Sequence, residues 1–186
     1  MKRTLSFVAL ALAVALTVAG CGNGSKTSSG GTFNDADVTF TQSMIPHHRQ
    51  AVEMATLART NGSAPEVKTL AVKIEGAQGP EIDTMTQWLK DWGQKVPSDS
   101  MSGMGHSGSS MPGMMSDADM RKLDAATGPT FDRMFLTMMT SHHSGAIEMA
   151  KTEQKDGKNP DAVALAKKIE ADQTAEIADM EKILGS

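Results

Sequence analysis

Two nearly identical phrases in the sequence carry residue types that bind metal ions. "MIPHHRQAVEMA" spans residues 44–55 and "MMTSHHSGAIEMA" spans residues 138–150. On a helix with about 100° per residue, both histidines of Met-x-x-His-His lie within about 60° of the methionine. Thioether and imidazole groups are soft ligands, which favours Cu(I) or Ag(I) over Zn(II), Mg(II) or Ca(II). The candidate ligands in the two phrases are Met44, His47, His48, Met54, Met139, His142, His143 and Met149.

A bridge between the phrases repeats the same chemistry in a looser form. The stretch from Pro97 to Met120 is rich in Gly, Ser and Pro, which disfavours a helix through its middle. Methionines spaced two or three residues apart in such a segment could bring two sulfur atoms to one ion. We expect further metal ligands here, namely Met101, Met104, His106, Met111, Met114 and Met115.

The start of the chain predicts export and a lipid anchor. Lys2 and Arg3 precede the apolar run "LSFVALALAVALTVAG", which has the layout of a signal peptide over residues 1–20. The run ends in "VAGC", so processing would leave Cys21 as a lipidated first residue, followed by a tether to residue 34. Cys21 is the only cysteine beside 15 methionines. Outside the cytoplasm thiolates are lost to disulfides, whereas thioethers still bind soft ions.

An internal repeat predicts the fold. A shift of 95 residues aligns 40–91 with 135–186 without a gap, and 20 of the 52 paired positions are identical. Each half contains two helix-period segments around a turn, "NGSAP" or "DGKNP", with Ser63 or Asn159 as a candidate helix cap. We therefore expect an all-α, antiparallel, ferritin-like four-helix bundle over residues 35–186. Its parts would be hairpins at 35–93 and 117–186 and a linker at 94–116, with a short helix capped by Ser116.

The second helix of each half carries polar residues whose roles remain open. Gln78 and Gln173 lie on the apolar stripe, where an unpaired amide is costly, so we expect them to hydrogen-bond the histidines as an outer shell. Met85 and Met180 could join that shell, although they, Met134 and Met138 could equally be core packing. Surface positions or inter-helix salt bridges are expected for Glu53, Glu81, Glu148 and Glu176.

The net charge and the spacing of the glutamates and histidines limit the classes of function that the protein could have. The net charge is −4, and removal of the Lys2 and Arg3 charges gives −4 − 2 = −6, with no basic stripe for nucleic acid. A metal-dependent oxidase on a ferritin-like bundle is one alternative, but no Glu stands three residues before any histidine, as di-iron bundles require. A structural lipoprotein with a polar core is another. The sequence favours a non-enzymatic, membrane-tethered copper-binding protein for tolerance, storage or delivery to an unidentified partner.

The same residues carry a family resemblance. The "HH..AIEMA" phrases, the segments "VKTLAVKIEGAQGPEIDTM" and "AVALAKKIEADQTAEIADM", and the lipoprotein start resemble the bacterial domain-of-unknown-function 305 family. The likeness covers roughly residues 35–186 without the bridge. Members are described as secreted or periplasmic ferritin-like bundles and include CopM-type copper-binding proteins. The resemblance implies a copper-binding role and no particular catalysed reaction.

Overall fold

Helices are the regular secondary structure in the part of the chain that the structure describes. A computed structural model describes residues 32–98 and 111–185. Its elements are helices α1 (Asp35–Asn61), α2 (Pro65–Asp91), α3 (Asp117–Ala125), α4 (Gly128–Asp156) and α5 (Pro160–Leu184). The predicted all-α bundle is confirmed, including the short helix that begins after Ser116. None of the described helices is long and apolar enough to cross a membrane.

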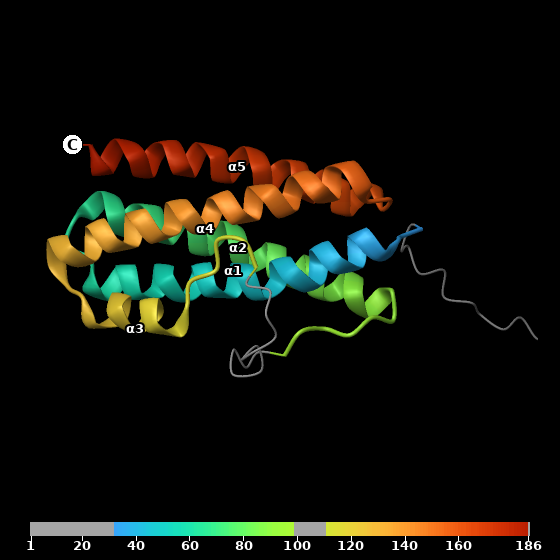
Figure 1. Ribbon diagram of the computed structural model, residues 1–186, viewed down its shortest axis with the longest axis horizontal. Helices are drawn as coiled ribbons and strands as arrows, with labels where there is room; N and C mark the ends of the chain where they lie inside the picture. Colours follow the sequence, from blue (N-terminus) through green and yellow to red (C-terminus); the bar gives the residue numbers. More distant parts are fainter. Residues whose placement is uncertain (1–31, 99–110, 186) are drawn as a thin grey trace, which may run out of the picture.

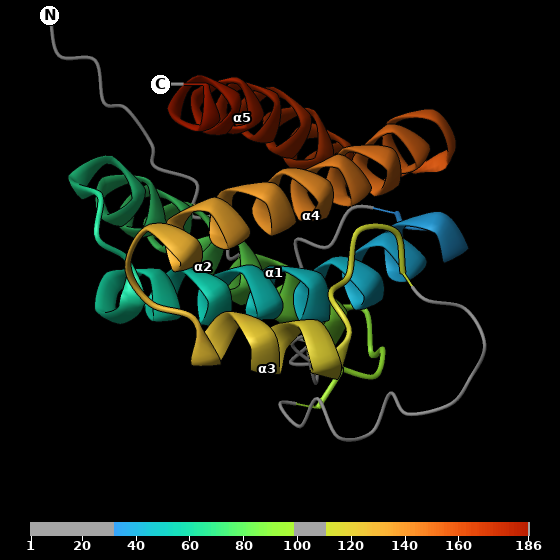
Figure 2. The same cartoon turned by 60° about the vertical axis from the view of Figure 1, so that its left-hand side comes forward.

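The four long helices form two antiparallel hairpins that meet through their first members. Helix α1 packs along α2, α4 packs along α5, and α1 lies against α4, whereas α2 and α5 touch each other little (Figure 1). Helix α3 lies beside α1 and α4 at one end of the bundle (Figure 2). The central position of α1 and α4 places both His-His phrases inside the molecule.

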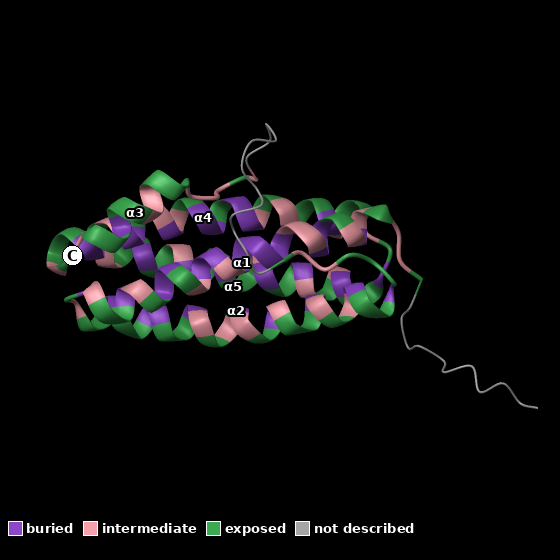
Figure 3. Ribbon diagram, turned by 90° about the horizontal axis from the view of Figure 1, so that it is seen from below, coloured by how far each residue is buried: buried purple, intermediate pink, exposed green. Residues whose placement is uncertain are grey.

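The buried apolar residues form two clusters rather than one continuous core. One cluster contains Met54, Phe131 and Met139, and the other contains Phe40, Met44 and Ala146. The duplicated positions explain this division, because Met44 and Met139 are equivalent in the two halves and fall in opposite clusters. The buried stretches of α1 and α4 face each other between the two clusters (Figure 3).

Helix caps explain where three of the helices begin. Asn34 caps α1 through bonds from Ala36 N and Asp37 N, and Asn159 caps α5 as predicted. Ser116 accepts from Asp119 N at the start of α3. Ser63 is not a cap, because Ala64 holds the cap position of α2 and the Ser63 hydroxyl instead donates to Asp132. The expectation for Ser63 was therefore wrong, since the Asp132 carboxylate of α4 accepts the hydrogen bonds from the backbone N–H groups of this turn.

Two equivalent aspartates join the hairpins at opposite ends of the bundle. Asp132 of α4 accepts from the backbone of Ser63 and Ala64, each at 2.9 Å. Asp37 of α1 accepts from Lys158 N at 3.0 Å and Asn159 N at 2.9 Å. Each carboxylate thus satisfies free N–H groups at the turn of the other hairpin, where helix dipoles favour negative charge.

The two ends differ because a second buried acid, Glu153, lies beside Asp37. Glu153 is 1 % exposed and stands where the first half has Ala58. Burial and the neighbouring Asp37 raise the pKa of Glu153 to about 8, so at neutral pH it is protonated and donates to Asp37. Burial by itself would raise the pKa of Asp37, but hydrogen bonds from Glu153 and from backbone N–H groups lower it overall.

Candidate metal centre

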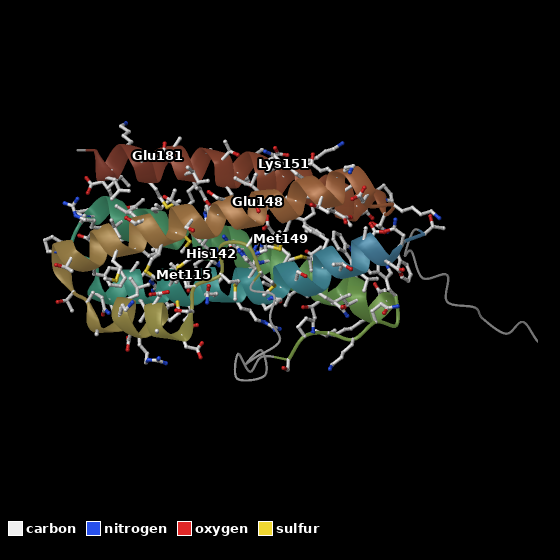
Figure 4. The ribbon with its side chains drawn as sticks, in the orientation of Figure 1. Met115, His142, Glu148, Met149, Lys151 and Glu181 are labelled. Carbon is white, nitrogen blue, oxygen red and sulfur yellow. The ribbon has the colours of Figure 1, made fainter. Side chains whose placement is uncertain are left out.

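The four repeated histidines meet in one buried layer between the two apolar clusters. His47, His48, His142 and His143 are each 0 % exposed. The His47 and His142 rings, which are equivalent in the two halves, lie 3.7 Å apart between centroids with an interplanar angle of 36°. The His142 and His143 ring centroids are 6.4 Å apart. Figure 4 shows His142 inside the bundle, where α4 faces α1.

A buried glutamate holds the second histidine of each pair. His48 Nε2 lies 2.8 Å from Glu81 Oε2, and Lys168 of the other hairpin donates to Glu81 Oε1 at 2.8 Å. The equivalent His143 Nε2 lies 2.8 Å from Glu176 Oε2, and Lys73 approaches Glu176 Oε1 at 3.8 Å. The expected inter-helix ion pairs of Glu81 and Glu176 are present, whereas Glu53 and Glu148 are exposed. That these two glutamates hold the histidines was not predicted.

The glutamates therefore make the bonds that were expected from the glutamines. Gln78 is 2 % exposed and neither atom of its amide has a hydrogen-bond partner in the described structure, and Gln173 Oε1 has none either. Glu81 and Glu176 stand one helical turn beyond the two glutamines. The signal in the sequence was the repetition of both glutamates at the 95-residue offset, whereas the expectation of surface positions or inter-helix salt bridges did not include a bond to a histidine.

These contacts fix which ring nitrogen faces the interior. A glutamate carboxylate accepts, so His48 and His143 donate from Nε2 and carry a lone pair on Nδ1. His47 Nε2 donates to the carbonyl of Pro112 at 3.1 Å, which leaves its Nδ1 with a lone pair as well. These Nδ1 atoms, and both nitrogens of His142, are buried without a hydrogen-bond partner in the described structure.

Buried unpartnered nitrogens are unfavourable unless a ligand satisfies them. Lowered pKa values favour the neutral form of His47, His48 and His142. Burial, then the charge of nearby rings, lowers the pKa of His47 to about 3, and the same causes bring that of His142 well below its usual value. Burial also lowers the pKa of His48, although the bond to Glu81 opposes it. Neutral imidazoles with free lone pairs are the form that binds metal ions.

The predicted methionine ligands lie on both sides of the histidine layer. Met44, Met54 and Met139 are fully buried in the apolar clusters, and Met149 is partly buried against the cluster that holds Met44. Met149 lies farther along α4 than His142 (Figure 4). Met85 and Met180 are buried, one in each cluster, and Thr140 Oγ1 lies 3.7 Å from the Met180 sulfur. Met134 and Met138 are partly buried against the core, as packing would require.

The end of the methionine bridge crosses the histidine layer. We name residues 111–115 the strap. Its methionines, Met111, Met114 and Met115, are partly buried, and its carbonyl of Pro112 accepts the bond from His47. Gln50 of α1 makes two hydrogen bonds with the backbone of Met115. Gln50 Nε2 donates to Met115 O at 2.9 Å, and Met115 N donates to Gln50 Oε1 at 2.8 Å. The strap is drawn in yellow in Figure 1, where it passes across α4 and α1.

Some predicted residues lie outside the described structure. These are Met101, Met104 and His106 of the bridge, and Cys21 with the leader and the tether up to residue 31. Among the described residues, no group of three or more His, Cys, Asp or Glu side chains is arranged to hold a metal ion. A site at the histidine layer therefore needs methionine sulfur or a shift of the rings to complete it.

Comparison with known proteins identifies the family. The model of the family described as "Domain of unknown function (DUF305)" matches residues 37–184. The chain belongs to the DUF305 family. No curated protein matches the sequence. The family match and the bundle confirm the resemblance drawn from the His-His phrases.

Solved structures of this DUF305 fold are similar over most of the chain. A DUF305 protein from Streptomyces coelicolor, named as secreted, is 35 % identical with a TM-score of 0.72 and covers 81 % of this chain and 91 % of its own. A DUF305 fragment from Deinococcus radiodurans is 29 % identical with a TM-score of 0.72, covering 83 % and 99 %. CopM in its Cu(II)-bound form is 31 % identical with a TM-score of 0.69, covering 80 % and 95 %. CopM also has Cu(I)-bound and Ag-bound structures.

Proposed function

We propose that this DUF305 protein binds Cu(I), and also Cu(II) or Ag(I), outside the cytoplasm and serves copper tolerance, storage or delivery. The observation that carries the proposal is the layer of four buried histidines, each with at least one ring nitrogen that has no hydrogen-bond partner among the described residues. Methionine sulfurs lie in the clusters on both sides and on the strap across it. Imidazole and thioether together suit a soft ion.

The relatives support the same function. CopM, 31 % identical, has Cu(I)-bound, Cu(II)-bound and Ag-bound structures. The name of the Streptomyces coelicolor relative places it among secreted proteins, which agrees with the predicted leader. We further propose that lipid on Cys21 tethers the domain to the cell membrane. The proposed ligands are the eight Met and His residues of the repeated phrases together with those of the bridge.

An oxidase of the di-iron type would need carboxylates free to bridge two irons. The two glutamates at the histidine layer are already engaged, since Glu81 bonds both His48 and Lys168 and Glu176 bonds His143. We therefore propose binding without a catalysed reaction.

Metal titration of the purified protein tests this function directly. Cu(I), Ag(I), Zn(II) and Fe(II) would be added separately against competing chelators of known affinity. We expect tight binding of Cu(I) and Ag(I) and weaker binding of Zn(II), with no consumption of dioxygen in the presence of Fe(II). Preference for Zn(II) over Cu(I), or the absence of Cu(I) binding, would contradict the proposal.

Glu81 provides a more specific prediction about how the site is oriented. In Glu81→Gln, the Lys168 ammonium can only donate, so the amide oxygen faces Lys168 and the amide NH2 faces His48 Nε2. His48 must then accept at Nε2 and carry its proton on Nδ1, the atom that faces inward. We expect about a 10–100-fold loss of Cu(I) affinity, as is typical when an outer-shell partner is lost.

Two further variants check this explanation in the same titration. Glu75→Gln alters only a surface ion pair with Arg59 and should leave the affinity unchanged. Glu81→Gln combined with Lys168→Met frees the amide oxygen for His48 and should restore part of the affinity. Equal affinities for all these variants would show that Glu81 does not orient a ligand.

A further inference from the structure

The strap is seated on a site in α4 that only glycine allows. A Cβ atom on Gly145 would overlap the carbonyl of Pro112 and lie 2.7 Å from Gly113 N. On the strap side, Gly113 has φ +76, and a Cβ there would lie 2.7 Å from Ser141 O and 2.8 Å from His142 O. The backbones of the strap and of α4 are therefore in direct contact, at the helical turn that carries His142.

The other edge of the strap is held by the equivalent position of α1. Gln50 and Gly145 occupy the same position in the two halves of the repeat. Gln50 bonds both N and O of Met115, a two-point contact like that between neighbouring strands. Between these contacts, Pro112 accepts the bond from His47. The five-residue strap thus contacts both copies of the His-His phrase at the same repeat position. In α1 this position is Gln50, which hydrogen-bonds the strap, and in α4 it is Gly145, which leaves room for the strap backbone.

We propose that the seated strap positions methionine sulfurs beside the histidine layer and controls how fast a soft metal ion exchanges there. This inference rests on the proposed function. Gly145, Gly113 and Gln50 act as positioning residues, because they hold Met111, Met114 and Met115 in place without being ligands themselves. The Pro112 carbonyl holds His47 through Nε2 and so fixes the ring with its Nδ1 lone pair free, and lifting of the strap would release this ligand together with the strap methionines.

A pair of glycine substitutions separates this role from helix stability. Gly145→Ala leaves the helix intact, because alanine favours helix more than glycine does, but its methyl group removes the seat. Gly76→Ala is the matched control, since it is also within a helix, has no proline beside it, and its Cβ would meet nothing within 4 Å. Both variants should retain the helix content of the parent protein, as far-ultraviolet circular dichroism would measure.

Two measurements would be made on each variant. In the metal-free protein, the Met115 amide should exchange slowly with deuterium in the parent and in Gly76→Ala, and rapidly in Gly145→Ala. In the Cu(I)-loaded protein, transfer to a chromophoric chelator should be about tenfold faster or more for Gly145→Ala, because binding changes act mainly on dissociation. Gly113→Ala, which alters no helix, should reproduce both effects.

The outcomes distinguish the strap from the metal function. If Gly145→Ala and Gly113→Ala release Cu(I) as slowly as Gly76→Ala does, the strap does not control exchange and the proposed function stands. A rapidly exchanging Met115 amide in the parent protein would overturn the seating of the strap itself. If the parent protein binds no Cu(I), both the proposed function and the control of exchange are wrong, even where the amide data show a seated strap.

Discussion

Replacing His142 by leucine should make the metal-free protein more stable and at the same time remove its Cu(I) site. Neither nitrogen of the His142 ring has a hydrogen-bond partner among the residues that the structure describes, although the residue is fully buried. Leucine of similar volume abolishes that desolvation cost, so we expect the free energy of unfolding to rise by about 1 kcal/mol. Cu(I) affinity should fall by about 100-fold or more, because a direct ligand matters more than an outer-shell partner.

The matched variant His48→Leu should behave differently in the absence of metal. It leaves the buried Glu81 Oε2 without its partner, so we expect a loss of about 1–3 kcal/mol in stability, together with weaker Cu(I) binding. Urea unfolding of both metal-free variants and Cu(I) competition titrations measure these effects. If the histidines were only a polar core, His142→Leu would leave Cu(I) binding unchanged.

Replacing Glu153 by glutamine should remove a loss of stability that develops as the pH rises. The pKa of Glu153 is about 8 in the folded protein, against 4.5 as its ordinary value. Below pH 4.5 both states hold the proton, and between pH 4.5 and 8 only the folded state does. The wild-type protein therefore loses stability across this window, and above it an ionised Glu153 lies buried beside Asp37.

Glutamine cannot ionise and can donate to Asp37 as protonated Glu153 does. We expect Glu153→Gln to match the wild type near pH 5 and to exceed it by about 2–4 kcal/mol at pH 9, as urea unfolding at several pH values would measure. The lowered pKa values of His47, His48 and His142 act in the opposite direction, but they cancel when the two proteins are compared at one pH. Glu148→Gln, at an exposed position, serves as the control. If the free energy of unfolding of wild type and of Glu153→Gln changed with pH in the same way, Glu153 would not hold its proton up to about pH 8 in the folded protein.

The fold could be predicted because its determinants are local or repeated. Periodic apolar residues, two turns with Gly and Pro, and a gapless repeat at an offset of 95 residues specify two helical hairpins. Ser116 and Asn159 act as caps through bonds to N–H groups two or three residues away, which a sequence displays directly. The same argument failed at Ser63, because its turn is satisfied by Asp132, 69 residues away.

The sequence by itself determined the donor types, their helical faces and their duplication, because spacing along one helix is set by 3.6 residues per turn. Only the tertiary structure decided which groups meet. It paired His47 with His142, gave His48 to Glu81 instead of Gln78, and divided Met44 and Met139 between two clusters. It also seated the strap on Gly145, where the informative feature is an absent side chain. Such contacts depend on how two hairpins dock, and docking is fixed by packing among residues far apart in the chain.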